Sequence, residues 1–245
     1  MIDTHAHLDV FEDADDAIDR AKAAGVRRIL TVGTDAARWP RALELAEGND
    51  GVFAILGIHP HEAAGDSSVD ELREALAHER AVAVGETGLD FYRDYAPRDR
   101  QQERFEAQLA LADELGKPLV IHTRAADDDV EAALVRHEGT VVLHCFSSPQ
   151  LLRPALERGW YVSFAGNVTY KNASDLRLAA TQVPRERLLA ETDAPYLAPQ
   201  ERRGRRNEPA YVVHTLAALA AARGDDADEL EAAVDANATR AFGLP

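Results

Sequence analysis

Six residues of this sequence carry side chains that bind divalent metal ions, and each stands where a β-strand is expected to end. They are His5, His7, Glu86, His122, His144 and Asp193. His5 and His7 are two positions apart, so a strand directs both imidazoles to the same face because successive side chains alternate. Glu86 lies between Gly85 and Gly88, an odd setting for a packing residue because glycine weakens a strand. A single histidine or aspartate at such a place is more often a hydrogen-bonded rim or turn residue, but six of them at the ends of five strands predict a metal site.

The number and type of these ligands indicate the chemistry. Six are too many for one catalytic zinc ion, which keeps three protein ligands and an open position. They suit two divalent ions per subunit, with Glu86 central enough in the strand order to bridge them. Imidazole mixed with carboxylate suits zinc, manganese, iron or nickel, whereas magnesium favours carboxylate-rich sites; zinc, magnesium and manganese are the expected candidates. Two such ions lower the pKa of a shared water to about 7, so we expect hydrolysis with a metal-bound water as the nucleophile.

The elements that must position these ligands alternate along the whole chain. Strands are expected near Ile2–His7, Arg28–Gly33, Phe53–Ile58, Ala81–Glu86, Leu119–His122, Val141–Cys145, Tyr161–Ala165 and Leu188–Asp193. Amphipathic helices are expected at Asp16–Ala24, Gln101–Leu115, Ala210–Ala222 and Ala227–Ala241. Eight strands, each followed by a helix, predict an α/β fold, a (β/α)8 TIM barrel of parallel strands with outer helices, in one domain over residues 1–245. The alternative, an open doubly wound sheet, would place a glycine-rich phosphate turn after the first strand, where this chain has His5 and His7.

The charge of the chain is strongly acidic. The net charge is −16, and only three of the 27 cationic residues, Lys22, Lys117 and Lys171, are lysines. Such a dispersed acidic, lysine-poor surface favours a halophilic protein, because concentrated salt screens its self-repulsion. The lone cysteine, Cys145, excludes an intrachain disulfide and is expected in the core, pointing away from His144. No signal peptide or membrane span is recognisable, so we expect a soluble, cytoplasmic protein without a membrane partner; the oligomeric state stays open, and a monomer is compatible.

Seven segments of the chain match one known family. They are DTHAHLD at 3–9, GIHPH at 57–61, GETGLD at 85–90, IHTR at 121–124, HCFS at 144–147, ETDAPYL at 191–197 and RNEP at 206–209. On these motifs the sequence resembles the TatD family of metal-dependent deoxyribonucleases, within the amidohydrolase-like barrels. The resemblance implies that His5, His7, Glu86 and Asp193 hold one metal ion and that Glu86, His122 and His144 hold the other. Ser148 departs from the glycine expected in the loop after His144 and leaves the ligand set intact.

Further residues are expected to contact the substrate or support the metals. His59 and His61 follow the third strand at the same mouth, although Pro60 between them makes a plain turn equally reasonable. Arg124 is expected to bind phosphate, and Arg203, Arg205 and Arg206 form a basic loop that favours an anionic substrate. Asp90 and Arg93 are expected to support Glu86. The sparse aromatic residues give no clear surface on which bases could stack.

We therefore expect a deoxyribonuclease that cleaves DNA phosphodiester bonds from a free end, with Glu86 and Asp193 as catalytic residues and Asp193 accepting the proton of the attacking water. RNA or tRNA are further candidate substrates. The alternative is a metal-dependent ester or amide hydrolase, such as a D-aminoacyl-tRNA deacylase, because the same barrel and ligands serve both reactions. A non-catalytic, metal-stabilised binding module is a third hypothesis, which the intact ligand set disfavours.

Overall fold

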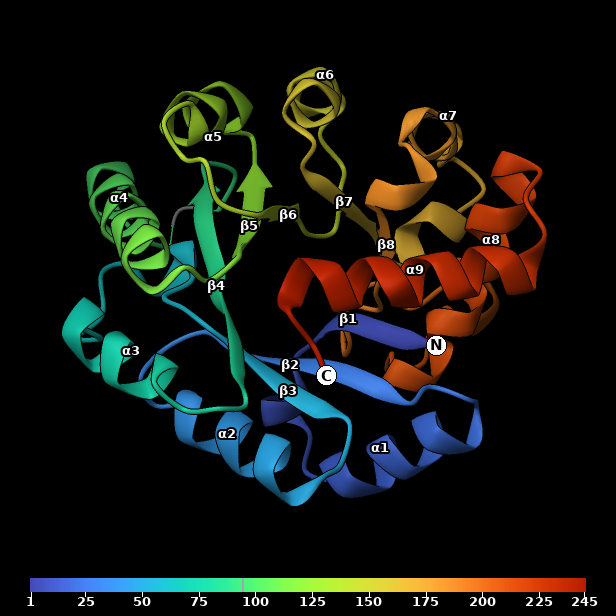
Figure 1. The fold of residues 1–245 in the computed structure, drawn as a ribbon, viewed down its shortest axis with the longest axis horizontal. Helices are drawn as coiled ribbons and strands as arrows, with labels where there is room; N and C mark the ends of the chain where they lie inside the picture. Colours follow the sequence, from blue (N-terminus) through green and yellow to red (C-terminus); the bar gives the residue numbers. More distant parts are fainter. Residues whose placement is uncertain (94) are drawn as a thin grey trace.

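The computed structural model describes residues 1–93 and 95–245 and contains eight parallel strands in one sheet, in the order β1 to β8. The strands are β1 (Ile2–Ala6), β2 (Arg28–Gly33), β3 (Val52–Leu56), β4 (Ala81–Asp90), β5 (Leu119–Arg124), β6 (Val141–Leu143), β7 (Tyr161–Phe164) and β8 (Leu188–Ala190). The helices are α1 (Ala14–Ala23), α2 (Trp39–Gly48), α3 (Val69–Leu76), α4 (Arg98–Leu115), α5 (Asp127–Leu134), α6 (Pro149–Arg158), α7 (Ser174–Gln182), α8 (Val212–Arg223) and α9 (Ala227–Phe242). Helices surround the strands in Figure 1, which confirms the predicted (β/α)8 barrel.

The first and last strands meet and close the ring. The backbone N–H of Asp193 donates to the carbonyl of His5 at 2.9 Å, and that of His7 donates to the carbonyl of Ala194 at 2.7 Å. We call these two hydrogen bonds the seam. They bring residues from the two ends of the chain together at the carboxyl ends of the strands, where barrel active sites are built.

The strands are mostly buried, although β5 becomes exposed at its carboxyl end, Arg124, and the helices pack buried side chains against them. α1 buries Ala17, Ile18 and Ala21 and ends just before Gly25, whose φ of +89° suits glycine. α4 begins at Arg98, three residues earlier than expected, because Pro97 precedes it in an extended conformation. It ends as expected at Gly116, whose φ is +62°.

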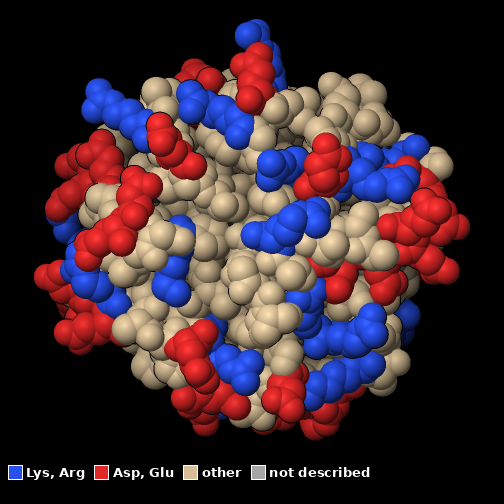
Figure 2. Space-filling view, in the orientation of Figure 1, with Lys and Arg blue, Asp and Glu red and all other residues tan. Residues whose placement is uncertain are grey.

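Helix α9 covers the amino-terminal end of the barrel. Asn237 Nδ2 donates to the carbonyl of Leu188 at 2.8 Å, and Arg28 pairs with Asp235 at 2.8 Å. α9 crosses the molecule in Figure 1, and in the same orientation Figure 2 shows acidic side chains around the periphery of this face, with basic ones among them and across its centre. Within the described residues, no helix combines the length and the apolar character that spanning a bilayer requires.

Candidate metal centre

Glu86 lies within β4 and not at its end, which corrects the predicted boundary. The pairing of β4 with β5 shifts register between Gly85 and Thr87, and a strand irregularity of this kind re-aims the side chain that it carries. A Cβ atom on Gly85 would lie 2.8 Å from Val120 Cβ, and one on Gly88 would lie 2.0 Å from the His122 carbonyl oxygen. The two glycines therefore let β5 approach closely and turn Glu86 into the mouth of the barrel.

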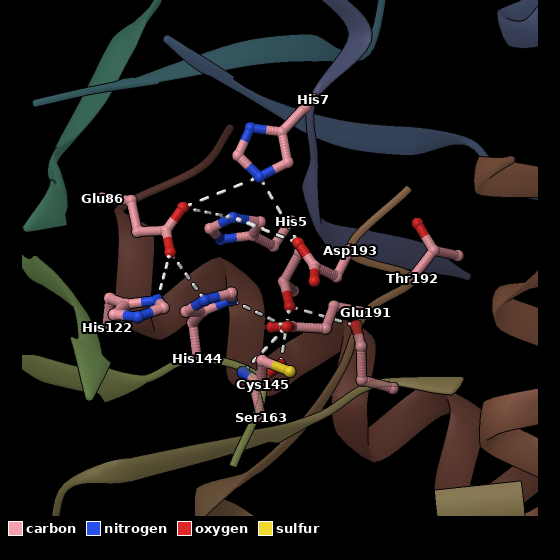
Figure 3. A network of polar contacts seen from close by, with 12 residues as sticks. His5, His7, Glu86, His122, His144, Cys145, Ser163, Glu191, Thr192 and Asp193 are labelled. Atoms are coloured by element: carbon pink, nitrogen blue, oxygen red, sulfur yellow. Dashed lines mark hydrogen bonds and ion pairs between the residues drawn. The ribbon is translucent and has the colours of Figure 1, made fainter. Parts of the chain in front are cut away.

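Imidazoles surround the Glu86 carboxylate: Figure 3 shows His5, His7, His122 and His144, and His59 also approaches it. His122 Nδ1, His144 Nε2 and His59 Nε2 lie 2.8, 2.9 and 3.2 Å from Oε1, while His5 Nε2 and His7 Nε2 lie 3.3 and 3.6 Å from Oε2. Burial alone raises the pKa of Glu86, but the positive charge of His144 and the hydrogen bonds of His122 and His144 outweigh it and hold the pKa well below 4.5. Glu86 is therefore an anion at neutral pH with histidines on both of its oxygens.

Asp193 joins the same cluster from the segment after β8. Its φ of +55° lies in the left-handed region, an uncommon conformation that is often kept at functional sites. Its Oδ1 lies 3.4 Å from His7 Nε2 and 4.0 Å from His5 Nε2. Burial raises the pKa of Asp193, but the hydrogen bond from His7 and the charge of His144 lower it on balance. Asp193 is thus a second carboxylate facing the histidine pair of β1.

His5 shows that these donors fit a metal ion. Its side chain is fully buried, and within the described residues neither ring nitrogen has a hydrogen-bond partner. The ring stacks on His144 with 3.9 Å between the centroids. The Nε2 atom, 3.3 Å from Glu86 Oε2 but without a well-aligned hydrogen bond, is a buried polar atom whose cost a cation shared with that carboxylate would reduce. Ligand atoms close enough to share one ion occur in the groups His5–His7–Asp193, His5–Glu86–His144 and His59–His61–His122.

A second layer of carboxylates holds these histidines. Asp90 Oδ2 lies 2.8 Å from His61 Nε2 and 3.2 Å from His122 Nε2. Burial raises the pKa of Asp90, but hydrogen bonds from His122, Arg93 and His61 lower it overall. Asp90 therefore supports His122, whereas the sequence suggested that it would support Glu86 directly.

Glu191 was not predicted as a site residue. It is 1% exposed, and its Oε1 accepts hydrogen bonds from His144 Nδ1 at 2.9 Å and from the Cys145 backbone N–H at 2.8 Å. Sequence analysis missed Glu191 because it lies within a predicted strand, where a packing residue is expected. The only signal was its acidic side chain two positions before the predicted ligand Asp193.

Two further residues brace the loop that carries Asp193. Asp3 accepts hydrogen bonds from the Thr192 backbone N–H at 2.8 Å and from Thr192 Oγ1 at 2.6 Å, and burial raises the pKa of Asp3 to about 8. Asn207 Nδ2 donates to the carbonyls of Thr192 and Tyr196. These contacts explain two motif residues, Asp3 and Asn207, to which the sequence assigned no role.

A cavity of about 690 Å³ opens above the cluster. Its lining includes His59, His61, Arg38, Arg93 and Arg124, besides the cluster itself. Burial is the main reason why the pKa of His59 falls to about 4, so this imidazole is neutral. His59 Nδ1 accepts the His61 backbone N–H at 3.1 Å, so His59 Nε2 carries the proton that faces Glu86.

The basic loop lies farther out. Arg203, Arg205 and Arg206 are not among the described residues that line the cavity. The Arg203 guanidinium lies 4.5 Å from the Tyr170 ring centroid, and Arg206 pairs with Asp13 at 2.7 Å. Any contact of these arginines with a substrate must therefore lie beyond the cavity.

The expectation for Cys145 is wrong. β6 ends at Leu143, so strand alternation does not extend to Cys145, whose φ is +45°. The residue is half-buried and lines the cavity beside His144. Burial and the nearby carboxylates raise the pKa of its thiol well above 9.0 in the metal-free protein.

Comparisons with known proteins agree with this geometry. Residues 2–243 match the family described as TatD related DNase. The chain belongs to the TatD family. A Bacillus subtilis relative named an uncharacterized metal-dependent hydrolase, YabD, is 39% identical over 255 residues, with 100% of this chain and 99% of the relative covered. Family membership and these relatives establish the protein as a metal-dependent hydrolase.

Two more TatD proteins define the comparison. A Klebsiella pneumoniae protein named 3'-5' ssDNA/RNA exonuclease TatD is 40% identical over 243 residues, with 95% of this chain and 92% of that protein covered. The crystal structure of YJJV, a TatD homologue from Escherichia coli K12, superposes with a TM-score of 0.94 at 34% identity and covers 100% of this chain and 98% of that one. The barrel and the arrangement of its elements are therefore those of the TatD family.

Proposed function

We propose that this TatD-family hydrolase is a nuclease that cleaves DNA phosphodiester bonds and removes nucleotides from a free end. The observation that carries the proposal is that Arg38, Arg93 and Arg124 line the cavity that holds Glu86 and Asp193, in a chain of net charge −16. Arg38 pairs with Asp9 at 3.0 Å, so the basic character of the rim comes from Arg93 and Arg124, and basic side chains at the cavity of an acidic protein favour an anionic substrate. Relatives named 3'-5' ssDNA/RNA exonuclease TatD, from Klebsiella pneumoniae and Cronobacter sakazakii, support the same substrate class.

Two divalent cations are proposed as cofactors, with zinc, magnesium or manganese as candidates. His5, His7, Glu86 and Asp193 would hold one, and Glu86, His122 and His144 the other. When bound, they would supply Lewis acidity toward the phosphate and lower the pKa of a water molecule. The position of Glu86 between His5 of β1 on one side and His122 of β5 and His144, just after β6, on the other supports its role in both sites.

The protein residues have separate tasks in the proposed reaction. Asp193 is an anion at neutral pH and accepts the proton of the attacking water. The Nε2–H of His59, which lies 3.2 Å from Glu86 Oε1 in the free protein, would turn to a non-bridging phosphate oxygen when substrate binds, and His61 holds the His59 tautomer through its backbone N–H. Arg124 presents a planar guanidinium to a phosphate at the cavity rim. We propose that Arg203, Arg205 and Arg206 meet phosphates farther along the strand.

One comparison of substrates tests this function. The purified protein is assayed on single-stranded DNA, duplex DNA, RNA and aminoacyl-tRNA with zinc, magnesium or manganese, and with a chelator as the control. We expect metal-dependent release of nucleotides from single-stranded DNA. Hydrolysis of the aminoacyl ester without cleavage of DNA would instead establish the deacylase alternative, and full activity in the chelator would exclude the metal mechanism.

The acidic surface supports a proposed working environment. With a net charge of −16 and only three lysines, the protein repels itself in dilute buffer and less so in concentrated salt. We propose that it acts in a salt-rich cytoplasm.

A further inference from the structure

Six large apolar side chains of the described residues are exposed: Val10, Tyr92, Tyr95, Val135, Leu178 and Tyr196. Four of them gather at the mouth of the metal cavity. Val10, Tyr95 and Tyr196 line the cavity, and Tyr92 lies beneath Arg124, which also lines it. Only Val135 and Leu178 lie elsewhere. An apolar patch left in water around a polar cavity marks a binding surface.

Tyr196 stands on one side of the mouth. Its side chain is 56% exposed, and its ring meets the His7 ring edge-on with 5.6 Å between the centroids. The backbone is fixed, because the Tyr196 N–H donates to the Asp193 carbonyl at 2.8 Å and Asn207 donates to the Tyr196 carbonyl. A rigid backbone therefore holds an exposed ring three residues after the proposed general base.

Tyr95 stands on the other side. It follows β4, whereas Tyr196 follows β8, and strands four apart in an eight-stranded ring lie across the barrel from each other (Figure 1). The Tyr95 ring is 62% exposed and meets the His61 ring edge-on at 4.7 Å. The guanidinium of Arg93 lies 5.9 Å from the Tyr95 centroid, which adds a cation to this aromatic edge.

We propose that Tyr95 and Tyr196 stack on nucleobases on either side of the scissile phosphate, which the metal ions held by Glu86 and Asp193 would bind, so that the site selects unpaired ends. This rests on the proposed nuclease function. Every base has a π-face that an aromatic ring can cover, so such contacts tolerate any sequence. A base within a duplex already stacks on its neighbours and cannot offer both faces. From the sequence no clear stacking surface was expected, because Tyr95 and Tyr196 follow β4 and β8 and only the closed barrel places both rings at one mouth.

The test combines changes in the protein with changes in the substrate. A short single-stranded oligonucleotide is compared with the same oligonucleotide carrying tetrahydrofuran abasic residues beside the scissile phosphate. For the wild-type protein we expect KM to be roughly 5- to 100-fold higher on the abasic substrate, the usual range for losing base–aromatic stacking. In the Tyr95→Leu/Tyr196→Leu double variant this ratio is expected to fall toward one.

Three controls separate stacking from other effects. Tyr→Phe substitutions keep the ring and should keep the ratio, and Leu178→Ala removes exposed apolar surface from α7 without changing it. Metal content measured on each variant reports whether the site is intact. Binding of both labelled oligonucleotides to Asp193→Asn gives the same ratio without hydrolysis.

The outcomes are distinguishable. If Tyr→Leu changes raise KM or the dissociation constant equally on both substrates, or if the wild-type protein does not discriminate between them, base stacking is wrong even where DNA is cleaved. If stacking discrimination is found but only the aminoacyl ester is hydrolysed, the stacking stands and the nuclease function fails.

Discussion

His144 Nδ1 and Glu191 Oε1 lie 2.9 Å apart, on the side of the imidazole ring that faces away from Glu86. The contact places the ring proton on Nδ1 and leaves Nε2, which is 2.9 Å from Glu86 Oε1, to face the metal cluster. A carboxylate behind a metal-binding histidine also makes the imidazole more basic. One buried glutamate therefore sets both the tautomer and the ligand strength of His144.

Replacing this glutamate should weaken metal binding. Glu191→Gln keeps the volume but removes the charge, and we expect metal affinity to fall about 10- to 100-fold, as for other partners of ligating histidines. Metal titration of the chelated protein measures the change. Asp113→Asn is the matched control, because Asp113 pairs at 2.8 Å with His137, a buried histidine that does not line the cavity. Equal affinity of Glu191→Gln and the wild type would show that Glu191 only fills space.

The two carboxylates of the cluster should behave differently. Glu86→Ala removes the carboxylate that the histidines of the cluster surround, so we expect loss of both metal content and turnover. Asp193→Asn keeps the shape and one oxygen donor, so turnover should fall by about 100-fold or more, the usual contribution of a general base, while metal content changes little. Elemental analysis alongside single-turnover rates distinguishes the two. A parallel loss of metal in both variants would assign Asp193 a ligand role alone.

Metal binding should release protons near neutral pH. In the metal-free protein burial lowers the pKa of His144, but Glu86 and Glu191 raise it more, and the pKa lies well above 6.5. A proton must therefore leave the ring when a metal ion binds it, so affinity should rise as the pH rises. Calorimetric titration in two buffers with different heats of ionisation measures the release. Binding heats independent of the buffer would contradict the expectation.

The same groups set the pH range in which the metal-free protein is stable. His144, with a raised pKa, contributes stability that is complete below 6.5 and is lost as the pH rises through the raised value. Glu86, with a depressed pKa, contributes stability that is present above 4.5 and is lost as the pH falls. The melting temperature of the metal-free protein should be highest between about pH 4.5 and 6.5, and it should fall at lower pH and at pH values above the raised pKa of His144.

Arginines inside and outside the cavity should differ in their effect on salt dependence. If Arg124 binds a phosphate, Arg124→Gln should raise KM for single-stranded DNA and make the slope of log KM against log salt shallower by about 0.7. Arg205→Gln is expected to act only on oligonucleotides long enough to reach the outer loop. A KM that stays unchanged for Arg124→Gln would remove this arginine from the substrate site.

Concentrated salt should raise the melting temperature of the protein and raise KM only modestly. We expect a higher melting temperature in molar KCl than in dilute buffer, because the net charge is −16. Three exposed phosphate contacts alone would lose roughly 500-fold in affinity between about 0.1 M and 2 M salt. Since stacking and contacts at the metals are less screened, KM should rise far less. A protein that melts lower in KCl, or whose KM rises several-hundred-fold, would contradict this.

The fold was predictable because its signals are local. Ile2 to Ala6 and the other strands are short buried runs between amphipathic helices, and the barrel follows from their alternation. The close packing around Glu86 was not predictable in detail. Gly85 and Gly88 look like residues that interrupt a strand, yet both lie within β4. They are needed there because any larger side chain would clash with Val120 or with the His122 carbonyl. The three exposed tyrosines were missed because they come from loops that only the closed barrel brings to one mouth.

The seam between β1 and β8 has a consequence for synthesis of the chain. His5 and His7 emerge from the ribosome early, but Asp3 lies 189 residues before Thr192, the residue that it binds across the seam. A chain that stops short of β8 leaves β1 with unpaired backbone groups, and such an exposed strand edge pairs readily with other chains. His5 and His7 therefore spend most of translation at an open strand edge, and products truncated before β8 should aggregate.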